Sequence, residues 1–80
     1  MSKEILFFSS PWCGPCKQMK TMLNQSIQNE LNIRIIDISK DMETATEYKV
    51  MCVPTFVILE GGKEVSRKSG ATTIDDLRVM

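Results

Sequence analysis

Two cysteines lie three residues apart near the start of the chain, in the segment Trp12-Cys13-Gly14-Pro15-Cys16. In the first turn of a helix, residues i and i+3 lie one above the other at roughly 5–6 Å, a separation that a disulfide can bridge. Unpaired N–H groups and the macrodipole at a helix N-terminus also favour the thiolate form of Cys13. The spacing therefore predicts thiol–disulfide exchange at Cys13 and Cys16.

A zinc site and a purely structural disulfide explain this segment less well. Structural zinc needs four ligands, whereas the chain has no histidine and only one further cysteine, Cys52. A disulfide that closes so short a loop constrains the unfolded chain little. We therefore expect no metal and no cofactor. Without histidine, any activation of a cysteine must come from backbone dipoles, burial or other charges.

The composition predicts one small domain, residues 1–80, that we expect to be monomeric. Ten basic and ten acidic residues cancel, and no basic stripe suggests a nucleic-acid partner. The apolar run Ile5–Phe8 is too short for a signal peptide or a membrane span, so we expect no membrane contact. The expected location is the cytoplasm, where stable disulfides are rare and catalytic ones are the usual kind.

The cysteines must be positioned by the elements that flank them. The apolar run within residues 3–8 predicts a strand buried on both faces, and Ser9-Ser10-Pro11 would end it. A helix is predicted from about Cys13 to Glu30. Its core-facing stripe consists of apolar residues that recur at helical spacing: Met19, Met22, Leu23, Ile27 and Leu31.

The remaining pattern predicts an α/β fold with a four-stranded mixed sheet and helices on both faces. Glycine pairs such as Gly61-Gly62 favour the tight turns that make neighbouring strands antiparallel. A βαβ unit at the start makes the first two strands parallel. The expected order is β-α-β-α-β-β-α. Its later elements are strand Ile33–Ile38, helix Asp41–Lys49, strands Thr55–Leu59 and Lys63–Lys68, and helix Ile74–Val79.

A second motif, Cys52-Val53-Pro54-Thr55, directly precedes the third strand. On its own, a proline there marks only a strand start or a tight turn. Together with WCGPC, it makes nearly the whole chain resemble the thioredoxin family. The matching stretches are Phe7–Lys17, Lys49–Phe56, Gly61-Gly62 and Lys68–Ala71.

The resemblance implies the thioredoxin fold and different roles for the two cysteines. Cys13 would attack a substrate disulfide, and Cys16 would then resolve the mixed disulfide. Gly14-Pro15 matches the reducing members of the family, which implies a protein-disulfide reductase recharged by a thioredoxin reductase or by glutathione.

The resemblance also implies a substrate-binding surface around the cysteines. In the family, the proline that matches Pro54 is cis, and the backbone of the preceding residue, here Val53, pairs with an extended substrate segment. The further substrate-binding positions carried over are Trp12, Gly14, Pro15 and Gly70, with Gly61 and Ala71 near them.

The chain departs from the family pattern at several positions. Thioredoxins usually place a buried acid six residues before the first cysteine and a lysine in the next strand; here these positions are Phe7 and Ile35. The proton of Cys16 would then pass to water, to the substrate, to the leaving thiolate, or to an acid such as Asp37. Asp37 is also explained as a solvated strand-end residue. Thr21 replaces a helix proline, so less kink is expected.

Length leaves other functions open. The matched region is glutaredoxin-sized, and a glutaredoxin-like protein recharged by glutathione could supply electrons, for example to ribonucleotide reductase. The segment Ser69–Thr72 could present N–H groups to a glutathione carboxylate. The CGPC centre favours thioredoxin. An interaction module with an incidental disulfide is the alternative from another class.

Cys52 lies two residues before the proline and should border the substrate groove. It is explained either as a bystander on that surface or as an oxidisable, partner-linking thiol.

Overall fold

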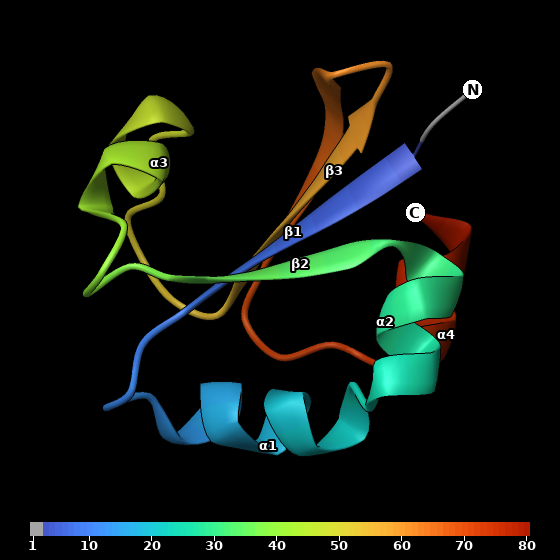
Figure 1. The fold of residues 1–80 in the computed structure, drawn as a ribbon, viewed down its shortest axis with the longest axis horizontal. Coiled ribbons are helices and arrows are strands. Elements are labelled where there is room, and N and C mark those ends of the chain that lie inside the picture. Colours follow the sequence, from blue (N-terminus) through green and yellow to red (C-terminus); the bar gives the residue numbers. More distant parts are fainter. Residues whose placement is uncertain (1–2) are drawn as a thin grey trace.

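The computed structural model describes residues 3–80 as a layered α/β fold (Figure 1). The longest helix, α1, has nine residues, and no helix in this range combines the length and apolar character needed to cross a membrane. The elements are β1 (Lys3–Ser9), α1 (Gly14–Met22), α2 (Gln25–Leu31), β2 (Ile33–Asp37), α3 (Met42–Glu47), β3 (Thr55–Glu60), β4 (Lys63–Ser69) and α4 (Ile74–Val79).

The four strands form one mixed sheet in the order β2-β1-β3-β4. β1 pairs with β2 in parallel and with β3 antiparallel, and β3 pairs antiparallel with β4. The turn between β3 and β4 uses positive φ angles of 61° and 83° at Gly61 and Gly62, as its sequence predicts. The predicted mixed four-stranded sheet is confirmed. β1 lies inside it, which explains why Ile5–Phe8 are fully covered.

Helices cover both faces of the sheet (Figure 1). α1, α2 and α4 pack on one face and α3 packs on the other, so side chains that alternate along β1 enter two separate cores. The first core contains Ile5, Phe7, Cys16, Met19, Leu23, Ile33, Phe56, Ile58 and Leu77. The second contains Leu6, Phe8, Ile36, Ala45, Val57 and Leu59.

The predicted continuous helix from Cys13 to Glu30 is wrong: it is two helices, broken at Leu23 and Asn24. Asn24 adopts an extended backbone, and its side chain accepts a hydrogen bond from Ile27 N at 3.0 Å. Asparagine favours this capping geometry over a helix interior, because its side chain competes for backbone hydrogen bonds. The break turns the chain without the proline that Thr21 replaces, so the expectation of a straighter segment is also wrong.

α3 is shorter than the predicted helix over Asp41–Lys49. The Asp41 carboxylate caps its start, accepting hydrogen bonds from Thr44 N at 3.1 Å and Thr44 Oγ1 at 2.8 Å. Lys49 has a left-handed φ of 54°, so the helix has ended before it. α3 thereby holds the residues that follow β2 over its own face of the sheet.

Candidate active site

Cys13 and Cys16 are joined by a disulfide at the start of α1, with their Cα atoms 5.2 Å apart. Cys13 is the N-cap residue with extended backbone angles, and the helix begins at Gly14. Pro15 lies in the first turn, where its missing N–H breaks no helical hydrogen bond. The predicted placement of the pair at the N-terminus of a helix is confirmed, with Cys13 as the cap and Cys16 in the first turn.

The two cysteines differ in exposure and in hydrogen bonding. Cys13 is partly exposed, whereas Cys16 is 0% exposed. Cys16 N donates a hydrogen bond to Cys13 Sγ at 3.1 Å. After reduction, this amide and the helix dipole would stabilise negative charge on the sulfur of Cys13.

The core side chains that surround Cys16 are apolar. Phe7 and Phe56 are fully buried and stacked, with ring centroids 4.7 Å apart and an interplanar angle of 6°. Ile35 packs against the same core. The positions at which thioredoxins usually hold an acid and a lysine are therefore filled by side chains that neither accept nor donate a proton.

Asp37 is poorly suited to replace that acid. Its Oδ1 accepts hydrogen bonds from Ser39 Oγ at 2.6 Å and Ser39 N at 2.9 Å, and these bonds lower the pKa of Asp37 below its ordinary value. A carboxylate with a lowered pKa is a weaker acceptor for the proton of a thiol. The geometry agrees with a strand-end residue that binds the following turn.

The Val53–Pro54 peptide bond is cis, as the resemblance implies. Val53 is partly buried between the two cores, and within residues 3–80 neither its N–H nor its C=O takes part in a hydrogen bond. Pro54 O accepts a hydrogen bond from Gly70 N at 2.8 Å, and Gly70 has a φ of 89°, which suits glycine. Gly70 thus holds the Val53–Pro54 turn, while the backbone of Val53 stays free to pair with an extended segment.

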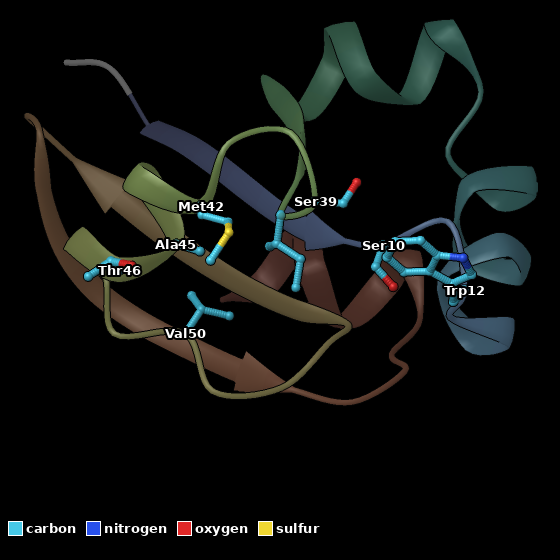
Figure 2. A pocket seen from close by; sticks show the side chains of 8 residues that line it. Ser10, Trp12, Ser39, Met42, Ala45, Thr46 and Val50 are labelled. Carbon is cyan, nitrogen blue, oxygen red and sulfur yellow. The ribbon is translucent and has the colours of Figure 1, made fainter.

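An apolar pocket of about 370 Å³ lies beside Trp12, between the β1–α1 loop and α3. Figure 2 shows Trp12 and Ser10 at one end and Met42, Ala45, Thr46 and Val50 at the other. Trp12 is 82% exposed and Met42 is 70% exposed. We call this cavity the Trp12 pocket; Ile38 and Ser39 complete its lining.

Sequence reasoning selected Trp12 for this surface but missed the other lining residues. Ser10, the β2–α3 segment and Val50 come from three stretches of the chain, and no motif links them. Gly14 and Pro15 are exposed next to Trp12, and a Cβ on Gly14 would meet no atom within 4 Å. Of the predicted binding residues, Trp12, Gly14 and Pro15 lie in or beside the disulfide loop. Gly61, which the resemblance placed near this surface, lies in the β3–β4 turn, at the opposite end of β3 from Pro54, so that expectation is wrong.

The third cysteine stays outside the disulfide. Cys52 is exposed, with its Sγ 3.8 Å from Thr55 Oγ1, and Met51 beside it is 93% exposed. Across residues 3–80, no three histidine, cysteine, aspartate or glutamate side chains are grouped as a metal ion would need.

Comparison with known proteins identifies relatives for almost the whole chain. The family model described as Thioredoxin matches residues 2–80. The thioredoxin of Bacillus subtilis (strain 168) is 39% identical over 66 residues, covering 79% of this chain and 64% of the relative. A bifunctional thioredoxin reductase/thioredoxin of Mycobacterium leprae (strain TN) is 34% identical over 67 residues, covering 80% of this chain and 15% of the relative.

The fold has a similar counterpart among solved structures. The X-ray structure of Fasciola hepatica thioredoxin superimposes with a TM-score of 0.82 at 32% identity, covering 96% of this chain and 75% of the other. The chain spans less than two thirds of the length of the two curated relatives named above. The dithiol sequence, the mixed sheet and the cis-proline turn all match what the resemblance implied. The chain belongs to the thioredoxin family.

Proposed function

We propose that this protein is a thiol–disulfide oxidoreductase that reduces protein disulfides through Cys13 and Cys16. The observation that carries the proposal is the asymmetry of the pair at the start of α1. A partly exposed Cys13 receives a backbone N–H, and it is bonded to a Cys16 that solvent does not reach. Nucleophilic attack needs the exposed sulfur, and resolution needs a second sulfur held close to the first.

The reaction follows from this arrangement in two exchanges. The Cys13 thiolate attacks one sulfur of a substrate disulfide, forms a mixed disulfide and releases the other substrate sulfur as a thiolate. The Cys16 thiolate then attacks Cys13 Sγ, forms the Cys13–Cys16 disulfide and releases the second substrate thiolate. Two electrons pass to the substrate, and its two thiolates take up the protons that the dithiol loses. The second exchange is intramolecular and therefore fast.

The surface around Cys13 supports protein partners. Trp12 next to the disulfide and Met42 across the Trp12 pocket expose large apolar side chains, and such exposed apolar surface marks interaction sites on small proteins. An extended substrate segment would pair with the open backbone of Val53, and an apolar side chain of a protein partner would enter the Trp12 pocket.

The oxidised protein must be recharged by an external donor. One relative carries both thioredoxin reductase and thioredoxin in its name, which supports a reductase of that kind as the donor. To test this, the oxidised protein is incubated separately with NADPH plus a thioredoxin reductase and with glutathione. We expect faster reduction by the reductase; faster reduction by glutathione would favour the glutaredoxin-like alternative.

The redox proposal itself is tested with a double variant, Cys13→Ser with Cys16→Ser. We expect it to lose all acceleration of insulin-disulfide reduction by dithiothreitol, while Cys52→Ser retains it. The double variant keeps the apolar surface. If it retained the biological activity in a host that lacks the natural protein, the redox proposal would fail in favour of an interaction module.

A further inference from the structure

The side chain of Ser9, the last residue of β1, has a buried hydroxyl without a partner. Ser9 is 0% exposed, and in the part of the chain that the structure describes its Oγ is the one buried side-chain nitrogen or oxygen without a hydrogen bond. Its carbonyl oxygen has a partner, because Ser9 O accepts a hydrogen bond from Ile38 N at 2.9 Å. Native proteins rarely leave a buried hydroxyl unpaired, since its lost hydration is not replaced. We therefore asked whether the Ser9 hydroxyl gains a hydrogen-bond partner when the disulfide is reduced.

The position of Ser9 places this hydroxyl on the face of the sheet that α1 covers. Side chains alternate along β1, and Phe7 faces the core that contains Cys16, so Ser9 continues on that face at the end nearest α1. The next residue ties the strand to the helix, because Ser10 O accepts a hydrogen bond from Cys13 N at 3.3 Å. Figure 1 shows the end of β1 leading through a short loop into the start of α1. Ser9 therefore lies at the end of β1 that leads into α1, on the same face of the sheet as Cys16.

The two redox states offer this hydroxyl different acceptors. In the disulfide, the sulfur of Cys16 is uncharged and a weak acceptor. Reduction adds two electrons and two protons, breaks the Cys13–Cys16 bond and leaves each sulfur as a thiol or, after loss of a proton, a thiolate. A thiolate is a strong acceptor of hydrogen bonds. On this face of β1, Ser9 is the polar side chain nearest to Cys16, because Phe7 fills the position usually held by an acid.

We propose that Ser9 Oγ donates a hydrogen bond to the thiolate of Cys16 after reduction, so that Ser9 stabilises the reduced protein over the oxidised one. The inference rests on the proposed redox function of the pair. Ser9 takes over one part of the role of the missing acid, since it stabilises the buried sulfur but does not accept its proton.

The substitution Ser9→Ala separates the two states. It removes an unpaired hydroxyl from the oxidised form and a hydrogen bond from the reduced form, so both changes favour the disulfide. We expect the equilibrium constant for reduction of the protein by dithiothreitol to fall about tenfold, which for a two-electron couple is about 30 mV. By linkage, the oxidised variant should melt at or above the wild-type temperature and the reduced variant below it.

The experiment measures this equilibrium constant and the melting temperatures of both redox forms, in a Cys52→Ser background that leaves one redox pair. The variants are Ser9→Ala and a matched control, Ser66→Ala, which lies half-buried on β4 away from α1. The control should leave the equilibrium constant unchanged. An unchanged constant in Ser9→Ala, or equal shifts in the melting temperatures of both forms, would show a merely structural role and overturn the inference.

The same measurement separates this inference from the function on which it rests. If the wild-type protein shows no reversible equilibrium with dithiothreitol, the proposed redox function fails. If the wild type cycles and Ser9→Ala matches it, the role of Ser9 alone is rejected.

Discussion

The surroundings of the two bonded cysteines contrast sharply in burial and polarity. Cys13 lies at the surface beside Trp12, which is 82% exposed, and its sulfur receives a backbone N–H. Cys16 is fully buried above the Phe7–Phe56 stack. We call these the exposed side and the buried side of the site. One helical turn is enough to separate them, because residue i caps the helix at the surface while residue i+3 turns toward the sheet.

The difference shows how one residue type acquires two roles from position alone. The exposed side can change with the partner it binds, since few contacts of the fold depend on it. The buried side carries core packing, so its residues serve stability and redox chemistry together. Substitutions on the two sides should therefore differ in what they affect.

The largest expected effect is on activity, from Cys16→Ser in a Cys52→Ser background. Cys13 can still attack, but no second thiol releases the substrate, so turnover should stop and a mixed disulfide should accumulate. Mass spectrometry of the protein after incubation with a protein disulfide measures the adduct. Cys13→Ser is the control, and an adduct of equal yield in that variant would contradict the assignment of attack to the exposed side.

On the buried side, Phe7→Ala should reduce the free energy of unfolding by about 3–5 kcal/mol, the usual loss when a large buried aromatic is truncated. The loss includes the stacking contact with Phe56. Urea denaturation monitored by circular dichroism measures it. A loss below about 1 kcal/mol would mean that Phe7 is not part of a close-packed core.

On the exposed side, Trp12→Ala should leave the free energy of unfolding within about 0.5 kcal/mol of wild type. It should instead raise KM for a protein disulfide about tenfold, because exposed tryptophans commonly dominate binding energy at protein interfaces. Steady-state kinetics with insulin and with a small aromatic disulfide distinguish binding from chemistry. Equal losses for the two substrates would show that Trp12 affects the disulfide itself rather than the recognition of proteins.

The helix break supports the buried side through α2, which packs Ile27 and Leu31 against the first core. Removing the cap with Asn24→Ala should cost about 1 kcal/mol of unfolding free energy. Ser26→Ala, an exposed substitution within α2, is the matched control and should cost less than about 0.5 kcal/mol. Equal losses of unfolding free energy in the two variants would show that the Asn24 cap does not stabilise the break between α1 and α2.

The smallest expected effect concerns pH and the cap of α3, on the exposed side. The hydrogen bond from the Thr44 hydroxyl lowers the pKa of Asp41 below the ordinary value of 3.8, and the hydrogen bond from Thr44 N lowers it further by a smaller amount. The carboxylate therefore contributes stability that is present above pH 3.8 and lost as the pH falls through the lowered pKa. The difference in melting temperature between wild type and Asp41→Asn should become smaller as the pH falls below 3.8. A difference independent of pH would contradict the charged cap.

Much of the fold was predictable because its signals are local. The Gly61-Gly62 turn, the alternation of apolar stretches and the cap position of Cys13 each depend on residues near one another in the chain. The prediction failed at Asn24, where helical periodicity on both sides hid a cap. Periodicity records which face is apolar and does not register a change of helix axis.

The sequence by itself determined the chemistry of the site: a dithiol three residues apart, a proline turn matching the family, and phenylalanine where an acid is usual. These are properties of residue identity and short spacing. Tertiary structure alone decided the Trp12 pocket, the open backbone of Val53 and the unpaired hydroxyl of Ser9. Each of these depends on segments far apart in the chain that meet only when the sheet and its two helical layers pack together.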